Sequence, residues 1–518
     1  MKMTISKWMV ALVSSVLITS CLDFDPQDQL SDDTYWSTSM EYELFANNFY
    51  GWVRTFTAAT EYRSVKPCHS DYYSDLFTNK DQRNLYSNGT NPIPAADVNY
   101  GSNYSHIRRC NMLLKNAKNY PSPKDIATYV GEAYFFRAYC YFDLLQLYGD
   151  AIIVTEPLEV GDPAMKVERN SRSEVTDFII SDLKEAAGLL PGQSQITKEG
   201  KISSEAANAF LSRVALYEGT WQKFRGNKDR AHALLDIAAN AAGSVINSGS
   251  YQLFKSSVLA DSTLKYLFIL ENAQCNPAGL TKSANKEYII SRRYDEVESP
   301  INMNVTQSML YNAVWITKKF ADMYLCQNGL PISYGGKSNP QFQGYGKIDS
   351  EFENRDNRMR HTMMRPHDDF WNNTKPRTLW NGKDKNPFIS NFIPKAGTGY
   401  HNQKWAVERK VADKKEGFDY PVLRYAEVLL NYAEAIYERD EAISDADLDL
   451  SLNQVRLRTN PDMKRLSNAL INNNPGMDMR TEIRRERTIE LFNEGFRLDD
   501  LKRWKTAEIE MPMDLVGV

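Results

Sequence analysis

The sequence predicts an all-α fold of packed helix pairs with a large loop-rich, irregular second half. Two observations carry this prediction. Apolar residues recur at three- and four-residue spacing in two separate blocks, as one buried helix face requires. The stretches between the blocks are rich in Gly, Pro and Asn and have few sustained helical periods. With 518 residues, the chain exceeds one typical core and is expected to form two or more packed units.

The first 20 residues have the order of properties of a secretory signal peptide. Lys2 and Lys7 give a positive start, and a short apolar run follows at positions 8–18. That run is about half as long as the roughly 20 apolar residues that a membrane-spanning helix needs. Removing residues 1–20 changes the net charge from −4 to −6, because two lysines are lost. This charge balance indicates no nucleic-acid partner.

The residues that end at Cys21, Ile-Thr-Ser-Cys, resemble the bacterial lipobox. In a lipobox the cysteine is acylated and becomes the mature N-terminus, and more than one acyl chain makes membrane anchoring stable. The acidic residues Asp23, Asp25 and Asp28 follow, and they resemble a surface-export signal of some Gram-negative groups. We therefore expect a lipid anchor at Cys21 and an outward-facing protein on the outer membrane. An ordinary signal peptide cut near Ser20 is the alternative.

The first block of the chain is expected to form four helices, at 128–150, 171–191, 203–221 and 230–251. In the first helix Phe136 and Cys140 share the buried face, and Gly149 is placed to end it. Ser171 and Glu174 form a capping box at the start of the second. Alanine, glycine and tyrosine at the expected contacts are typical of tetratricopeptide-like helix hairpins, although no clean repeat of about 34 residues is present.

The second block contains three more helical segments, at 423–439, 448–458 and 481–504. The last one includes RRERTIELFNEGFRLDDLKRW, in which Glu486, Arg487 and Glu490 flank an apolar stripe. We expect an amphipathic helix with ion pairs along its exposed rim. Its predicted role is structural rather than ligand binding.

Two long interruptions separate the helical segments, at 56–105 and at about 250–420. The second holds four of the nine tryptophans, including Trp315, Trp371 and Trp380. Loops this long inside a compact protein are usually functional or disordered, and tryptophan-rich segments are poor candidates for disorder. Function is therefore expected in these loops rather than on the helices.

Catalytic and cofactor motifs are absent from the sequence. It contains no G-x-G-x-x-G and no G-x-S-x-G, and the GGKS stretch at 335–338 lacks the upstream glycine of a phosphate loop. The cysteines other than Cys21 are widely spaced without a Cys-x-x-Cys pair, so no structural zinc site is expected. No other cofactor is predicted either. These observations favour a binding protein over an enzyme.

Seven segments, in order along the chain, resemble the SusD/RagB family of surface nutrient-binding lipoproteins. They are CLDFDPQDQLSDDTYW, GEAYFFRAYCYFDLLQLYGD, KKFADMYLCQNGLPI, RDNRMRHTMM, YPVLRYAEVLLNYAEAIYE, LNQVRLR and RRERTIELFNEGFRLDDLKRW. The chain departs from the family pattern in two places. Tyr100 stands where many members have a tryptophan, shortly before Tyr104. The chain also stops at Val518 without a Pro-Gly-Tyr-like tail, as a short variant or a truncated reading frame would.

The resemblance divides the chain into a signal peptide at 1–20, an N-terminal helical region at 21–250 and a C-terminal region at 251–518, with a loop-rich insert at about 251–420. It implies a non-enzymatic lipoprotein that captures oligo- or polysaccharides for a SusC-like TonB-dependent outer-membrane barrel. A peptide-binding member of the same family and a cell-surface glycan hydrolase are the alternatives.

Aromatic side chains in the two interruptions form the candidate ligand site. Flat aromatic faces bind the C–H face of a sugar ring, while amide and charged side chains bond its hydroxyls. Both kinds of residue are interleaved in these loops. The candidate ligand-binding residues are Tyr72, Tyr73, Tyr86, Tyr100, Trp315, Trp371 and Trp380. For each of them, filling a small core beneath a long loop is the alternative.

Overall fold

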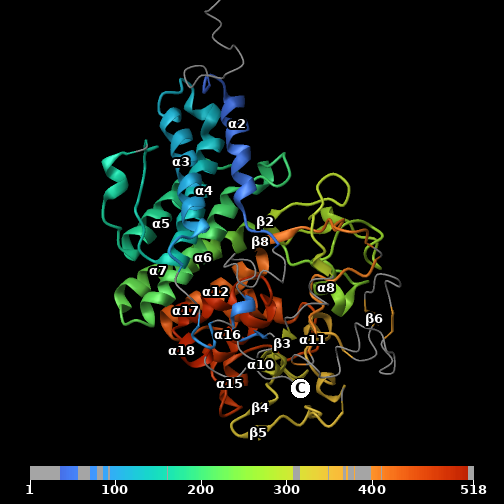
Figure 1. Ribbon diagram of the computed structural model, residues 1–518. Helices are drawn as coiled ribbons and strands as arrows, with labels where there is room; N and C mark the ends of the chain where they lie inside the picture. Colours follow the sequence, from blue (N-terminus) through green and yellow to red (C-terminus); the bar gives the residue numbers. More distant parts are fainter. Residues whose placement is uncertain are drawn as a thin grey trace, which may run out of the picture.

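The computed structural model is mostly helical, and it confirms an all-α fold with an irregular second half (Figure 1). It describes residues 35–56, 71–78, 86–90, 94–159, 161–306, 315–347, 349–365, 398, 400–409 and 411–511, and the backbone of 369–370 and 378–379. Within these residues, no helix has both the length and the apolar character needed to cross a membrane.

The N-terminal block is an array of antiparallel helices, drawn blue to green in Figure 1. Its helices are α2 (Ser39–Asn47), α3 (Val98–Ala117), α4 (Ala127–Tyr148), α5 (Arg172–Leu189), α6 (Ser204–Lys223) and α7 (Lys228–Ser248). From α3 to α7, each helix packs on the next one along the chain. This succession of neighbouring hairpins is the predicted tetratricopeptide-like arrangement.

Local sequence signals set the ends of these helices. The Ser171 hydroxyl caps α5 and Glu174 completes the capping box, as predicted. Gly149 ends α4 with a φ of 78°, a backbone conformation that favours glycine. Cys110 and Cys140 are buried free thiols, and Cys140 lies on the buried face of α4 as predicted.

Close approach between α6 and α7 depends on Gly219. A Cβ atom at this position would lie 2.9 Å from Cγ of Leu235 and 3.2 Å from its backbone nitrogen. Gly131 has a similar place on α4, where a Cβ would meet Cγ of Leu190 at 3.0 Å. Small residues therefore set the distance between neighbouring helices.

The C-terminal block continues this array on the far side of α7, and Figure 1 draws it in orange and red. Its helices are α12 (Tyr425–Asp440), α13 (Asp445–Leu450), α14 (Leu452–Arg456), α15 (Asn468–Asn472), α16 (Met479–Glu490), α17 (Arg497–Trp504) and α18 (Ala507–Glu510). Helix α12 packs on α7, α6 and α16, and α17 packs on α6. The two blocks are thus continuous although about 170 residues separate them in the chain.

The residues between the blocks form only short elements. The helices are α8 (Thr263–Leu267), α10 (Lys318–Met323) and α11 (Asn357–Thr362). The strands are β2 (Tyr288–Arg292), β3 (Trp315–Ile316), β4 (Ser333–Tyr334), β5 (Lys337–Ser338), β6 (Asp369–Phe370) and β7 (Thr378–Leu379). The two flanking strands are β1 (Phe77–Thr78) and β8 (Tyr420–Arg424). Strands pair antiparallel as β1–β3, β2–β8, β4–β5 and β6–β7 within the described residues.

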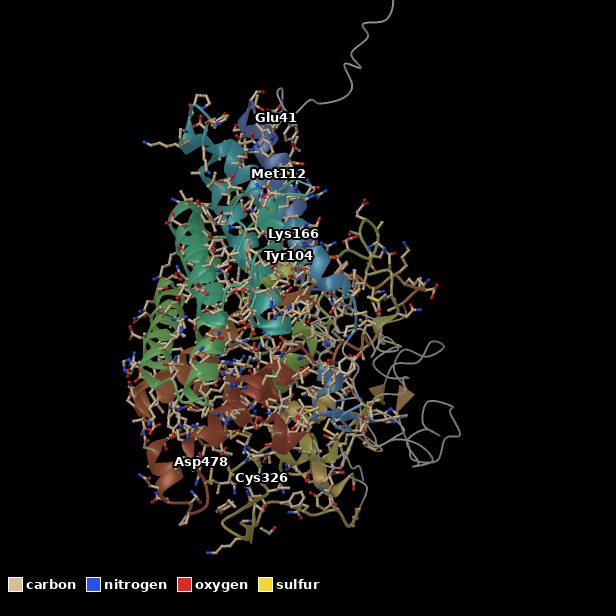
Figure 2. All side chains as sticks on the ribbon, turned by 60° about the vertical axis from the view of Figure 1, so that its left-hand side comes forward. Glu41, Tyr104, Met112, Lys166, Cys326 and Asp478 are labelled. Carbon is tan, nitrogen blue, oxygen red and sulfur yellow. The ribbon has the colours of Figure 1, made fainter. Side chains whose placement is uncertain are left out.

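The molecule is elongated along the helical array. Figure 2 shows Glu41 of α2 at one end, and Asp478, which precedes α16, and Cys326 near the other. One apolar core runs through both blocks and into the short elements between them. The irregular half therefore packs on a rigid helical body.

Candidate functional site

Asp71 attaches the first loop-rich stretch to the C-terminal block. Its carboxylate accepts the backbone N–H groups of Glu494 and Gly495 at 3.1 Å each and of Arg497 at 2.8 Å. Such N–H groups at the start of a helix have no partner within the helix, and here the helix is α17. Burial raises the pKa of Asp71 to about 7, and the backbone N–H groups of Arg497 and Gly495 offset this rise only in part.

Asp75 makes a second attachment, in which cationic side chains rather than backbone N–H groups contact the carboxylate. Nε and Nη2 of Arg497 each bond its carboxylate at 2.8 Å, and the Lys319 ammonium lies 2.7 Å away. Burial alone would raise the pKa of Asp75, but Arg497 and Lys319 lower it to about 2. The segment 71–78 is therefore fixed on both α17 and α10.

Strand pairing brings the two interruptions together. In β1–β3, Phe77 pairs with Ile316 and Thr78 with Trp315. The Thr317 backbone N–H and hydroxyl then bond the carbonyls of Leu76 and Asp75, both at 2.9 Å. Residues about 240 positions apart in the chain thus lie side by side.

A third stretch joins the same place. The Ile316 backbone N–H donates to the Tyr400 carbonyl at 3.2 Å, and Met363 bridges to Asn402. These contacts fix both ends of the stretch that carries Trp371 and Trp380. The described residues of segments 71–78, 315–317 and 400–402 therefore converge around β3.

Three of the predicted site residues are largely enclosed. Tyr72 and Tyr73 are 5% and 2% exposed, and Trp315 is 8% exposed. The Tyr72 ring contacts that of Phe77 with centroids 4.8 Å apart. The Trp315 indole N–H is buried and makes no hydrogen bond within the described residues. These rings offer little stacking area, although the Trp315 N–H is a donor without a partner there.

The other predicted residues lie elsewhere or outside the described chain. Tyr86 and Tyr100 are half-buried, and the Tyr86 ring lies 5.2 Å from that of Tyr73. Tyr100 is not in a loop, because α3 already begins at Val98; the predicted interruption therefore ends earlier than residue 105. The Tyr100 ring packs on that of Tyr104 at 4.8 Å. Cys21, Trp371 and Trp380 lie outside the described residues.

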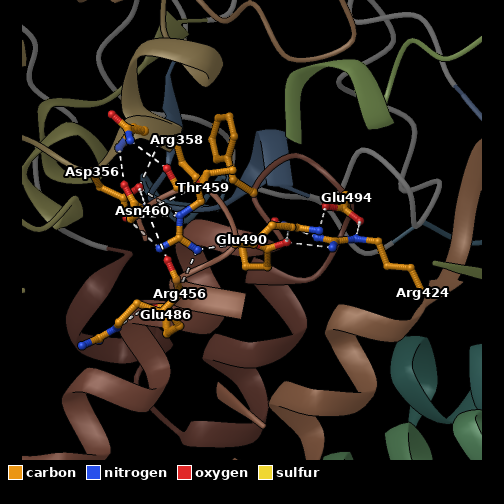
Figure 3. Close-up of polar contacts among 12 residues, drawn as sticks. Asp356, Arg358, Arg424, Arg456, Thr459, Asn460, Glu486, Glu490 and Glu494 are labelled. Atoms are coloured by element: carbon orange, nitrogen blue, oxygen red, sulfur yellow. Dashed lines mark hydrogen bonds and ion pairs between the residues drawn. The ribbon is translucent and has the colours of Figure 1, made fainter. Parts of the chain in front are cut away.

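A buried ionic cluster lies beneath the converging segments (Figure 3). It contains five carboxylates and five cations, namely Glu287, Asp356, Glu486, Glu490, Glu494, Arg358, Lys404, Arg424, Arg456 and Arg458. Their side chains are at most 6% exposed. They come from α11, α14, α16, the end of β8 and the connecting loops. The cluster therefore links the irregular half to the C-terminal helices.

Arg424 and Arg358 connect most of this buried ionic cluster. The Arg424 guanidinium lies 2.8 Å from the carboxylates of Glu287, Glu490 and Glu494. Arg358 bonds Glu490 at 3.1 Å, and its Nη1 lies 2.6 Å from Glu486. Bidentate and shared contacts of this kind are among the stronger polar interactions in proteins.

The position of these charges corrects one prediction. The ion pairs of 481–504 were expected on an exposed rim, but Glu486, Arg487 and Glu490 are all buried. Burial alone would raise the pKa of Glu490, but Arg458, Arg424 and Arg358 together bring it well below its usual range. The charges balance within the protein, so this helix has the structural role that was predicted.

The described residues do not present an evident reaction centre. Among them, no group of three or more His, Cys, Asp or Glu side chains could hold a metal ion. The two carboxyl groups with pKa values near 7, Asp71 and Glu416, are enclosed and accept backbone N–H groups. This chemistry suits a rigid support for a binding surface.

Two family models match most of the chain between them. Residues 272–514 match the SusD family, and residues 22–216 match a model described as starch-binding associating with outer membrane. The chain belongs to the SusD/RagB family. The two matches cover α2 to α5 with most of α6, and the C-terminal block with its buried ionic cluster.

Curated SusD-like relatives match over part of their length. A SusD-like protein of Formosa agariphila is 27% identical over 41% of this chain and 42% of its own. A SusD-like protein of Bacteroides ovatus is 24% identical over 65% of both chains. The matched part is thus less than two thirds of each relative.

Solved structures share the SusD fold over nearly the whole chain. A SusD-like carbohydrate-binding protein from Bacteroides fragilis has a TM-score of 0.71 at 23% identity and covers 92% of this chain and 88% of its own. Surface glycan-binding protein A from Bacteroides fluxus has a TM-score of 0.58 at 18% identity and covers 93% of both chains. At these identities the likeness shows the fold alone.

Proposed function

We propose that the protein is a surface-exposed lipoprotein that captures glycans and delivers them to a SusC-like TonB-dependent outer-membrane transporter. The observation that carries the proposal is the SusD/RagB match on both helical blocks, over 22–216 and 272–514. The lipobox-like residues at Cys21 support anchoring by acyl chains. Capture takes place without turnover in this proposal.

The convergence of three segments around β3 supports a binding face on the irregular half. Asp71, Asp75 and the buried ionic cluster hold these segments rigidly against the helical body. A rigid support lowers the conformational entropy lost when a ligand binds. Trp371 and Trp380, which lie between Met363 and Tyr400 in the sequence, are proposed to stack on sugar rings.

A binding screen with a built-in cleavage assay tests this function. Residues 22–518, made without lipid, are screened against arrayed plant, host and fungal glycans and short peptides. The same wells are then assayed for new reducing ends. Binding of an intact glycan is the expected result. New reducing ends would overturn the proposal in favour of a hydrolase, and binding of peptides alone would overturn its glycan part.

The double variant Trp371→Ala/Trp380→Ala tests the proposed stacking. We expect affinity for the best glycan to fall at least tenfold. Stacking of an aromatic ring on the C–H face of a sugar contributes about 1 kcal/mol or more per ring to the binding free energy. Tyr345→Ala, at an exposed aromatic outside the candidate set, is the matched control and should retain full affinity. Unchanged affinity in the double variant would remove these residues from the site without affecting the function.

Anchoring is tested separately at Cys21. Cells that make the wild-type chain and are fed an alkyne-labelled fatty acid should yield a labelled protein in the outer-membrane fraction. Cys21→Ala should remove the label. A labelled Cys21→Ala chain, or an unlabelled wild-type chain, would contradict acylation at this cysteine.

A further inference from the structure

A polar cavity separate from the converging segments lies between the N-terminal helices and the β2–β8 pair. Its volume is about 580 Å³, and its lining comes from 193–201, 250–252, 282–293 and Asp419. These residues belong to the α5–α6 connection, the segment after α7, strand β2 with the residues that flank it, and the residue before β8. Sites for small ligands usually have about 300–1,000 Å³. Among the described residues, none of the aromatic residues predicted for the ligand site lines this cavity.

Cationic groups outnumber acidic groups in its lining. The cations are Lys201, Lys282, Lys286 and Arg293, and the acids are Glu199 and Asp419. Both acids are already paired: Lys282 bonds Asp419, and Arg293 bonds Glu199 at 2.6 Å. Both carboxylates of the lining therefore already have a cationic partner.

Lys286 is the lysine of the lining whose positive charge has no acidic partner among the described residues. Its side chain is exposed and makes no ion pair or hydrogen bond with any described residue. Its backbone carbonyl accepts from the Gln252 N–H at 3.1 Å, which fixes the chain beside the cavity. Lys201, in contrast, is neutralised by the buried Glu132 carboxylate at 2.9 Å. Lys286 is therefore the cation available to an anion.

Two amide side chains add donors rather than acceptors. The Asn285 oxygen accepts the backbone N–H groups of Glu287 and Tyr288 at 3.0 and 3.2 Å. The Gln193 oxygen accepts from the Tyr251 hydroxyl at 2.8 Å. With both oxygens occupied, the NH₂ groups are what these side chains can offer a ligand. The cavity is therefore rich in donors, which fits a ligand rich in acceptors.

Arg293 can also exchange its ion pair with Glu199 for one with a ligand anion at a small cost in free energy. Its pair with Glu199 is exposed, with side chains 43% and 77% accessible, and such pairs contribute about 0–1 kcal/mol. The loop approaches Arg293 closely at Gly200, where a Cβ would meet its Cδ at 3.0 Å. Gly200 has a φ of 84°, so a glycine is suited to this position.

We propose that this cavity is a second saccharide site, specific for a sugar unit that carries an anionic group, either a carboxylate or a sulfate ester. Lys286 and Arg293 bind the anion, and the NH₂ groups of Asn285 and Gln193 bond ring or anion oxygens. Thr197 and Ser291 place further hydroxyls in the lining. The proposal rests on the proposed function and names the class of glycan that the protein takes.

Calorimetry with three probes tests this site on residues 22–518. The probes are a tetragalacturonate, which carries carboxylates alone, a sulfated galactan tetrasaccharide, which carries sulfates alone, and the same galactan without sulfate. We expect one anionic probe to bind and its affinity to fall as NaCl is raised. Lys286→Gln should weaken that binding about tenfold, and Lys255→Gln, at an exposed lysine outside the cavity lining, should not.

Hydrogen exchange gives a second readout, since amides in 193–201 and 282–293 should exchange more slowly with the anionic probe bound. Equal affinity of wild type and Lys286→Gln for an anionic probe would overturn the site. So would binding of neutral glycans together with no binding of either anionic probe, and in that case the proposed function stands. Failure of every glycan to bind overturns both proposals.

Discussion

Helix α4 of the N-terminal block and helix α16 of the C-terminal block bury different kinds of side chain although the blocks form one continuous array. In α4 of the N-terminal block, the buried face consists mainly of residues such as Phe136, Cys140 and Leu144. In α16 of the C-terminal block, Glu486, Arg487 and Glu490 are as completely buried. The first face is stabilised by loss of apolar surface from water, and the second by ion pairs that neutralise one another.

This difference shows that a buried helix face can carry charged side chains as well as apolar ones. A charged helix is normally assigned to the surface because burial of an unpaired charge is expensive. Here each buried charge has partners on neighbouring elements, so burial is tolerated once the whole C-terminal block is assembled. Loss of one charge from the buried ionic cluster should therefore destabilise the protein far more than loss of one charge from an exposed pair.

The largest effect is expected for Glu490→Gln. This change keeps the shape of the side chain but leaves Arg358, Arg424 and Arg458 short of one buried negative charge. We expect the free energy of unfolding to fall by about 3–5 kcal/mol, as for other broken buried pairs. Urea denaturation followed by circular dichroism measures the change.

Glu156→Gln is the matched control in the N-terminal block. Glu156 pairs with Lys118 at 2.9 Å, but both side chains are more than half exposed. The same substitution should therefore change stability by less than about 1 kcal/mol. If Glu490→Gln is as mild as this control, the cluster does not stabilise the C-terminal block in the way described.

The decrease in the free energy of unfolding at acidic pH is expected to depend on Asp75. Its pKa is about 2 in the folded protein, below that of an ordinary Asp at about 3.9. A lowered carboxyl pKa contributes stability above the unfolded pKa, and this contribution is lost as pH falls from about 4 to about 2. The loss corresponds to about 2–3 kcal/mol. Asp75→Asn should flatten the stability profile in that range, as measured by denaturation at several pH values.

Asp71 is expected to act in the opposite direction. Its pKa is raised to about 7, so the folded state holds a proton that the unfolded chain releases near pH 4. The stability that this proton provides is complete below about pH 4 and is lost as pH rises to about 7. Asp71→Asn should remove that decline. The same slope between pH 4 and 7 in both proteins would contradict the assignment.

A smaller effect is expected from helix packing in the N-terminal block. Gly219→Ala places a methyl group 2.9 Å from Leu235, and we expect a loss of about 1–2 kcal/mol even though alanine favours the helix. Gly188→Ala, near the end of α5, has open space around its Cβ and should stabilise by up to about 1 kcal/mol. Thermal unfolding of both variants provides the comparison, and equal shifts would argue against close packing at Gly219.

The sequence predicts the N-terminal block well for a physical reason. The spacing of Phe136 and Cys140, the capping box at Ser171 and the terminal Gly149 each act within a few residues, so a local pattern reveals them. The C-terminal block is different, because Arg424 pairs with Glu287, 137 positions away, and a helical period carries no sign of that partner. The helical character of this block was predicted, but segment 448–458 divides into α13 and α14, segment 481–504 divides into α16 and α17, and the burial of the charges was not predicted.

The candidate site is less predictable than the fold. The sequence identifies aromatic residues but does not reveal whether their rings are buried in the protein or exposed to a ligand. In the structure, Tyr72, Tyr73 and Trp315 are largely buried. The contacts of Asp71 and Asp75 with α17 span more than 420 positions, and so no local signal reveals them. The segments RDNRMR and RRERTIELFNEGFRLDD, which carry the family resemblance, contain five members of the buried ionic cluster: Asp356, Arg358, Glu486, Glu490 and Glu494. They were the sequence signal that could have revealed it. The assignment of Trp371 and Trp380 to ligand binding stays a prediction.

The measurement that tests the central claim most directly is a calorimetric titration of residues 22–518 with the best glycan from the screen, followed by mass spectrometry of the glycan recovered from the same cell. A saturable binding isotherm and a glycan of unchanged length are the predicted results for capture without turnover. A shortened glycan, with heat that continues after saturation, would contradict the claim and indicate a hydrolase.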